Sequence, residues 1–184
     1  NFKDRYFKQE LRKAQEKKEQ EDAYVRLARK SLEGYMLKHT PISVPKDLPE
    51  EFLSRKAGVF VSLKKDGRLR GCIGTIAPTT GSVAEEIIQN AVSAGTKDYR
   101  FPQVAYDELP YLEYSVDVLG EPEEIDSSDQ LDVKKYGLIV TKGRKRGLLL
   151  PDLEGVDTIE DQIMITKQKA GIDPDDEDVK MERF

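Results

Sequence analysis

The chain has 184 residues, of which 38% are hydrophobic and 35% are charged. This composition is polar for a globular protein but excludes a chain that is disordered overall, and the length suits one domain, or two closely packed subdomains, with a core of its own. The formal net charge is −5, from 30 Lys and Arg against 35 Asp and Glu, which argues against a nucleic-acid binder because such proteins usually show a basic balance or stripe.

The chain contains one cysteine, Cys72, so an intrachain disulfide is excluded. A lone cysteine favours a reducing compartment, and we therefore expect a cytoplasmic protein. No apolar run approaches the roughly 20 residues that cross a bilayer, and the first residues lack the apolar core of a signal peptide. Because the chain does not begin with methionine, we expect it to be a fragment of a longer protein or to have trimmed ends.

The first 22 residues are rich in charge and glutamine, mix both signs, and lack glycine and proline. Within them, a thin apolar stripe recurs at helical spacing: Phe2, Tyr6, Phe7, Leu11 and Ala14. This pattern is typical of an exposed helix, so we predict a charged helical arm or linker over residues 1–22. The alternative is a docking helix for a partner or for a second copy of the chain.

A β-hairpin is predicted in the middle of the first half. Residues 59–63 favour a strand, and Asp66-Gly67 is a pair that tight hairpin turns prefer because both positions tolerate positive φ. Residues 68–76 form the predicted return strand. They include Gly71 and Gly74, and glycine inside a strand indicates a bulge or a close approach to the backbone.

Three helices are predicted from apolar spacing and capping residues. Residues 24–36 present a broad apolar face. Ser82 and Glu85 form a capping box ahead of a second apolar face. Thr158 caps the last helix, which runs through Ala170 and ends at Gly171.

Further strands complete the prediction. Residues 112–119 alternate well enough to predict a half-buried strand. Residues 136–141 and 147–150 predict a second hairpin around residues 142–146, and residues 173–178 form an acidic tail. Because the strand pairs look antiparallel and are interspersed with helices, we predict an α+β fold with antiparallel sheets and packed helices.

Two segments carry a resemblance to a known family: Leu69-Arg70-Gly71-Cys72-Ile73-Gly74-Thr75 and Asp98-Tyr99-Arg100-Phe101-Pro102. Together they resemble the signature of the AMMECR-type family, whose prokaryotic members are labelled AmmeMemoRadiSam system protein A. The resemblance covers roughly residues 23–184, which we take as the family domain. Many members have Pro or Ser in place of Tyr99, and some have His in place of Tyr136.

The resemblance implies a fold and a set of partners. It implies a larger part built from both ends of the chain, a smaller part from the middle, and a cleft between them. No activity is assigned to the family, and no cofactor is implied. The implied partners are a Memo-like protein and a radical S-adenosylmethionine enzyme, and Memo-like domains also occur fused to this family.

Cys72 is the candidate nucleophile, because a thiolate is the strongest nucleophile this chain offers. On a regular strand Arg70 would share its face, and Arg100 would bring a second cation if its loop folds back. Gly71 and Gly74 would let backbone amides turn towards an anion. The structural alternative is a small buried core cysteine.

Other candidate groups have plainer interpretations. Asp98 and Arg100 form either a loop salt bridge or a substrate clamp, since the arginine fork suits carboxylates and phosphates. His39, the one histidine, favours an exposed position near a helix C-terminus over pairing with Cys72. The basic turn at residues 142–146 and the acidic tail favour solvated segments, and no His or Cys cluster predicts a metal site.

We therefore expect a ligand-binding or catalytic component that handles a small or protein-attached acidic substrate. In this hypothesis Cys72 is the nucleophile or thiol contact, Arg70 and Arg100 contact the anion with Asp98, and Gly71 and Gly74 supply amides. The rival hypothesis is a non-catalytic interaction or scaffold domain, in which the same motif supports packing and the arm tethers a partner.

Overall fold

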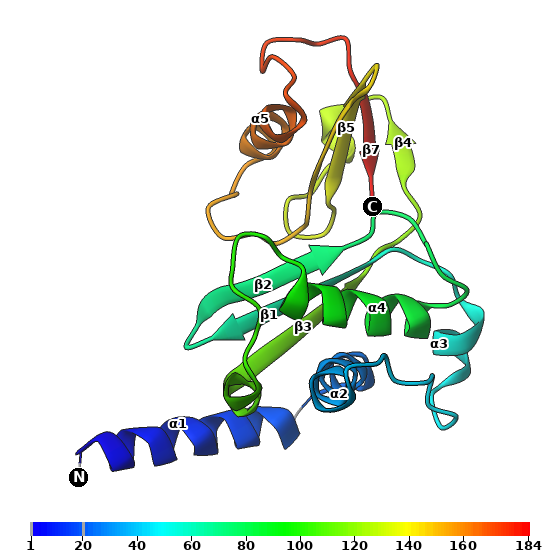
Figure 1. Ribbon diagram of the computed structural model, residues 1–184. Helices are drawn as coiled ribbons and strands as arrows, with labels where there is room; N and C mark the ends of the chain where they lie inside the picture. Colours follow the sequence, from blue (N-terminus) through cyan, green and yellow to red (C-terminus); the bar gives the residue numbers. More distant parts are fainter. Residues whose placement is uncertain (1, 20) are drawn as a thin grey trace. The chain divides into compact units, whose positions relative to one another are not determined.

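The computed structural model describes residues 2–19 and 21–184 and divides into two compact units (Figure 1). Unit 1 extends from the N-terminus to Leu119, and unit 2 comprises Gly120–Phe184. Each unit has its own antiparallel sheet and its own apolar core. The predicted α+β class, with antiparallel sheets and packed helices in a larger and a smaller part, is confirmed.

Unit 1 is built on a three-stranded sheet in the order β2-β1-β3. The strands are β1 (Val59–Lys65), β2 (Arg68–Gly74) and β3 (Leu112–Val118), and all pairs are antiparallel. Helices α2 (Ala23–Lys38) and α4 (Val83–Thr96) lie on the same side of this sheet (Figure 1). Val59, Val61 and Leu63 of β1 are fully buried in the core, so the residues between them, Phe60 and Ser62, belong to the opposite face.

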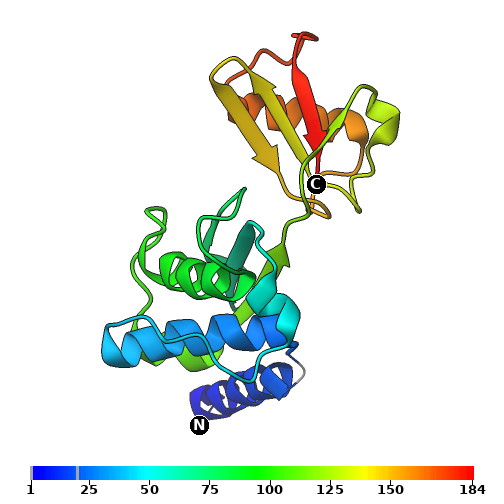
Figure 2. The same cartoon turned by 90° about the vertical axis from the view of Figure 1, so that its right-hand side faces the viewer.

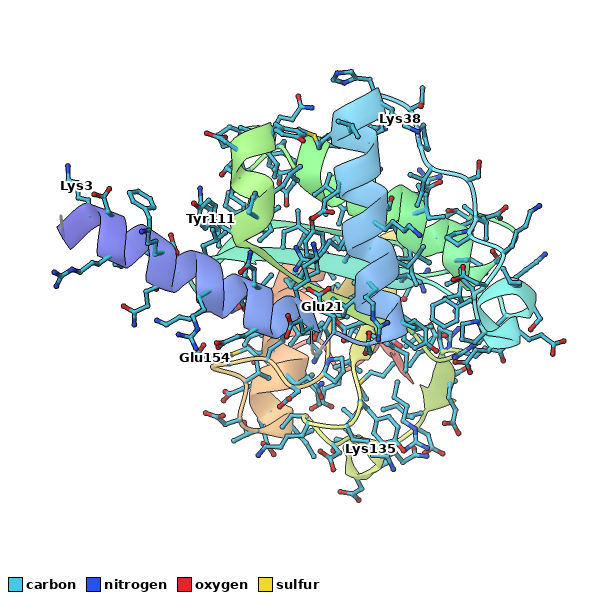
Figure 3. The ribbon with its side chains drawn as sticks, turned by 90° about the horizontal axis from the view of Figure 1, so that it is seen from below. Lys3, Glu21, Lys38, Tyr111, Lys135 and Glu154 are labelled. Carbon is cyan, nitrogen blue, oxygen red and sulfur yellow. The ribbon has the colours of Figure 1, made fainter. Side chains whose placement is uncertain are left out.

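Three further elements belong to unit 1. They are α1 (Phe2–Glu19), the short α3 (Glu50–Ser54) and the 3-10 helix η1 (Tyr106–Tyr111). Helix α1 contacts η1 and β3, and Figure 3 shows it running from near Lys3 towards Glu21, with Tyr111 beside it. The arm predicted over residues 1–22 is helical over Phe2–Glu19, while residues 1 and 20 lie outside the described residues. Tyr6 and Phe7 on this helix are about half exposed. Its role as a linker or docking helix stays a prediction.

Unit 2 has a four-stranded sheet in the order β4-β7-β5-β6. Its strands are β4 (Glu123–Ile125), β5 (Leu138–Lys142), β6 (Lys145–Leu149) and β7 (Lys180–Arg183), and η2 (Ser128–Gln130) follows β4. Helix α5 (Ile159–Ala170) packs against one face of this sheet (Figure 2). Together these elements enclose the smaller core, which includes Leu138, Val140 and Ile172.

Local signals placed most elements correctly. Asp66 and Gly67 have φ of 52° and 72°, as the predicted turn requires. The Ser82 hydroxyl accepts from the Glu85 amide at 3.2 Å. The reciprocal half of the predicted capping box is wrong, because the Glu85 carboxylate accepts from Gly81 instead.

Two expectations need correction. The larger part is not built from both chain ends, because β7 at the C-terminus pairs with β4 and β5 inside unit 2. The chain does not end in the predicted acidic tail, because strand β7 follows it. The sequence pattern predicted neither β7 nor α3 and β4. All three are at most five residues long, too short for periodicity to reveal them. Within residues 2–19 and 21–184, every helix lacks the length or the apolar character that a membrane-spanning helix needs.

Candidate functional site around Cys72

Cys72 lies on β2, one of the two edge strands of the unit 1 sheet, opposite Ser62 of β1. A regular ladder growing from the Asp66-Gly67 turn would pair Ser62 with Gly71. The register instead shifts between Leu63 and Lys64, so that Leu63 pairs with Gly71 and Arg70 becomes an extra residue. This irregularity brings the serine hydroxyl beside the thiol, with Ser62 Oγ donating to Cys72 Sγ at 3.1 Å.

Arg70 is held by Glu108. Its Nε and Nη2 donate to the two carboxylate oxygens, each at 3.0 Å, and its Nη1 donates to the Pro102 carbonyl at 2.8 Å. The expectation that Arg70 shares a face with Cys72 assumed a regular strand, and that premise was wrong. The arginine fork instead joins β2 to η1 and to the loop that contains Pro102.

Glu108 is the centre of this second cluster. Besides Arg70, it accepts from Lys65 Nζ at 3.1 Å and from the Ala105 amide at 2.7 Å. These donors, with Arg70 as the largest cause, lower the pKa of Glu108 from 4.5 to about 2. The carboxylate is therefore ionised at neutral pH and satisfied by protein donors.

Asp98 connects the loop of residues 98–102 to the edge of β2. Its side chain is 3% exposed, and Oδ2 accepts from the Cys72 amide at 2.9 Å. Arg100 donates to the same carboxylate through Nε at 3.0 Å and Nη2 at 2.7 Å. The hydrogen bond from Arg100, ahead of that from Cys72, holds the pKa of Asp98 well below its usual range.

Arg100 is the cation that lies beside Cys72. Its loop folds back, so Nη2 is 3.5 Å from the Cys72 carbonyl oxygen, while the side chain stays 47% exposed. The hydrogen bond to Asp98 is the main cause that raises the pKa of Arg100. Tyr99, which precedes it, is 96% exposed.

Both motif glycines have packing reasons. A Cβ on Gly71 would lie 2.2 Å from the Ala94 carbonyl oxygen of α4, and one on Gly74 would lie 2.2 Å from the Phe60 ring. Each glycine therefore permits a close approach to β2. The supply of amides by these two residues stays a prediction, and the Cys72 amide already donates to Asp98.

The sequence missed three side chains that shape this region, namely Ser62, Glu108 and Phe60. Of these, Ser62 could have been predicted as the strand neighbour of Cys72 by counting residues back from the hairpin turn. That count fails by one residue, because the register shifts between Leu63 and Lys64. His39 is exposed and ends α2 in the left-handed region with φ 57°, as predicted. Across residues 2–19 and 21–184, no group of three His, Cys, Asp or Glu side chains is placed to hold a metal ion.

Comparisons with known proteins agree on one family. The AMMECR1 family model matches residues 25–184. A protein of Thermotoga maritima is 50% identical over 165 residues, which cover 89% of this chain and 95% of that protein. A protein of Clostridium acetobutylicum is 54% identical over 169 residues, 91% of this chain but 36% of that relative, so the chain spans about a third of its length.

A solved structure also matches. The crystal structure of an uncharacterised protein from Pyrococcus horikoshii superposes with a TM-score of 0.81 at 39% identity. The match covers 88% of this chain and 86% of that chain. At this identity the likeness supports a shared fold and a shared family.

Proposed function

The chain belongs to the AMMECR1 family, and we propose that it binds a small or protein-attached acidic ligand at Cys72. In this proposal Arg100 contacts the anionic group and the Cys72 thiol is the reactive contact. The observation that carries it is the Asp98 carboxylate, which accepts from both the Cys72 amide and the Arg100 guanidinium. One buried carboxylate thus holds the Arg100 guanidinium beside the backbone of Cys72, the residue that bears the sole thiol.

The guanidinium of Arg100 has donors left for a ligand. Asp98 engages Nε and Nη2, and within the described part of the chain Nη1 has no hydrogen-bond partner. A guanidinium held on one side by a carboxylate and open on the other suits a second carboxylate or a phosphate. Arg70 has a different role in this proposal, because Glu108 and Pro102 occupy its fork; it positions the loop that bears Arg100.

Backbone N–H groups on the outer edge of β2 could also donate to the ligand. The Cys72 amide points away from β1, since it donates to Asp98. Alternation along an antiparallel strand directs the Gly74 amide to the same side. We therefore include the Gly74 amide as a further donor to the ligand, with Gly71 acting through its packing on α4.

Action alongside a Memo-like protein and a radical S-adenosylmethionine enzyme belongs to this proposal as well. The Clostridium relative contains much sequence beyond the matched segment, which leaves room there for a fused domain. The rival is a scaffold domain in which the thiol has no chemical role. A Cys72→Ser variant that stays folded and acts normally with these partner proteins would favour the scaffold domain.

The direct test compares two alkylating reagents of different charge on the single thiol. We expect iodoacetate to react with Cys72 faster relative to iodoacetamide than it does with free cysteine, by about fivefold, because one nearby cation contributes about 1 kcal/mol to an anion. Mass spectrometry of the folded protein gives both rates.

Arg100→Gln should return the reagent ratio to that of free cysteine. Arg68→Gln is the matched control, since Arg68 is an exposed arginine on the same strand, and it should leave the ratio unchanged. A thiol that reacts only after denaturation, or a ratio equal to that of free cysteine, would refute the site and support the scaffold domain.

A further inference from the structure

We propose that a groove along α2 is a docking site for an acidic, amphipathic segment of a partner protein. The α2 groove is a pocket of about 530 Å³ in unit 1, formed by α2, η1, the end of α1 and the segment after α2. Figure 3 views unit 1 from this side, with Lys38 at the far end of α2 and Tyr111 at the end of η1. The groove shares no residue with the site at Cys72.

Large apolar side chains in the α2 groove are open to solvent. Leu37 on α2 is 63% exposed and Tyr106 on η1 is 62% exposed, and both line the pocket together with Ile42 and Pro110. Such exposed side chains contribute little to the core of their own unit. Their gathering in one hollow is typical of a surface that binds another chain.

The groove depends on a specific backbone approach at Gly34. A Cβ on Gly34 would lie 2.5 Å from Ile42 Cγ2, so glycine lets the segment after α2 return against the helix. His39 makes this return possible, because it ends α2 with φ 57°. The segment then places Ile42 in the wall of the groove, which gives the apolar surface a fixed shape.

Positive charge surrounds the apolar surface. Lys18, Lys30 and Lys38 line the groove and are exposed, and within the described residues none of their amines takes part in an ion pair. Glu33, the acid among the described lining residues, has Oε1 3.7 Å from Arg29 Nη1. The groove is thus locally positive in a chain whose net charge is −5.

This combination selects the occupant. A peptide segment with one or two large apolar side chains would fill the hollow, and flanking Asp or Glu would meet the three lysines. A second copy of this chain fits less well, because two molecules with a net charge of −5 each repel one another. Nucleic acid would use the amines but not the apolar floor.

The test uses two synthetic peptides. Each is a fluorescein-labelled helix of about 14 residues with leucines one turn apart, flanked by glutamate in one peptide and by lysine in the other. We expect the glutamate peptide to bind with Kd on the order of 10⁻⁵ to 10⁻⁴ M and the lysine peptide at least tenfold more weakly. Fluorescence anisotropy measures both, and rising salt should weaken the first.

Variants locate the binding. Leu37→Asp should raise the Kd of the glutamate peptide about tenfold or more. The double variant Lys30→Glu with Lys38→Glu should raise that Kd about three- to tenfold. Leu53→Asp is the matched control, because Leu53 is an exposed helical leucine outside the groove, and it should bind like the parent protein. Circular dichroism checks that each variant is folded. If Leu37→Asp is unfolded, the double lysine variant decides the test.

Equal binding of the two peptides, no binding at millimolar concentration, or an unchanged Leu37→Asp affinity would each overturn the proposal. So would a concentration-dependent dimer that Leu37→Asp dissolves, since the occupant would then be a second copy. Cys72→Ser should leave peptide binding unchanged, so this inference can fail or hold independently of the site at Cys72.

Discussion

The β1–β2 hairpin of unit 1 and the β5–β6 hairpin of unit 2 are constructed alike. Each turns through a glycine with positive φ, Gly67 at 72° and Gly143 at 59°. Each packs on one helix, and each return strand brings a glycine against a helix carbonyl. A Cβ would lie 2.2 Å from Ala94 O at Gly71 and 2.5 Å from Thr166 O at Gly147.

They differ in register. The β5–β6 ladder is regular from Leu138 to Lys142, whereas the β1–β2 ladder shifts by one residue beside Leu63. The shift aligns Ser62 with Cys72 and makes Arg70 an extra residue, whose side chain reaches Glu108. The irregularity, more than the hairpin itself, therefore makes the candidate site, as bulges do when they redirect a side chain.

The largest effect is expected where the two hairpins are alike. Gly71→Ala should destabilise unit 1 by about 3 kcal/mol or more, and Gly147→Ala should destabilise unit 2 by about 2 to 3 kcal/mol, because the nearest atoms belong to helix backbones that must shift. Hydrogen exchange read by mass spectrometry reports each unit separately.

Gly120→Ala is the control for both glycines, since nothing lies within 4 Å of its Cβ position, and its effect should be small. Protection equal to that of the parent protein in both alanine variants would contradict the shared helix contact.

The next effect concerns the edge of β2, where the hairpins differ. Asp98→Ala removes the acceptor for the Cys72 amide and for the Arg100 guanidinium. We expect a loss of about 2 to 4 kcal/mol in the free energy of unfolding, because a buried amide and a cation lose their partner. Urea unfolding measures it, with Asp47→Ala, an exposed aspartate, as the control. Equal urea midpoints for Asp98→Ala and Asp47→Ala would show that the Asp98 hydrogen bonds do not stabilise the folded protein.

The pH dependence of unit 1 should reveal the Glu108 cluster. Its pKa falls from 4.5 to about 2 on folding, so its stabilisation is complete above pH 4.5 and is lost as pH falls towards 2. The contribution is at most about 3 kcal/mol by proton linkage. In Glu108→Gln, stability at neutral pH should fall and its loss with acid over this range should be shallower than in the parent protein.

Glu121→Gln, which alters an exposed glutamate, should keep the steep acid dependence. Parallel curves for Glu108→Gln and the parent protein, measured by urea unfolding at several pH values, would remove Glu108 from the explanation of acid sensitivity.

The smallest effect sharpens the likeness of the turns. Gly67→Ala and Gly143→Ala should each cost about 1 kcal/mol, because both residues have positive φ and nothing lies within 4 Å of either Cβ position. Thermal unfolding measures the loss of stability in each of the two variants. Costs that differ by more than about 1 kcal/mol would mean that the two turns carry different strain.

Patterns in the amino-acid sequence predicted the elements that depend on near neighbours along the chain. The hairpin at Asp66-Gly67, the cap at Ser82, the alternation of β3 and the end of α5 at Gly171 all follow from turn, capping and spacing rules. The motif around Cys72 also identified the family, which the comparisons confirm. These signals are local, because each depends on residues a few positions apart.

The contacts that build the candidate site follow from tertiary packing. Arg70 reaches Glu108 across 38 positions and Asp98 reaches Cys72 across 26, and no spacing rule gives such partners. The register shift beside Leu63 and the return of β7 to the centre of its sheet depend on packing against other elements in the same way. Long-range contacts gain their free energy only when the chain is folded, so a pattern of near neighbours cannot specify them.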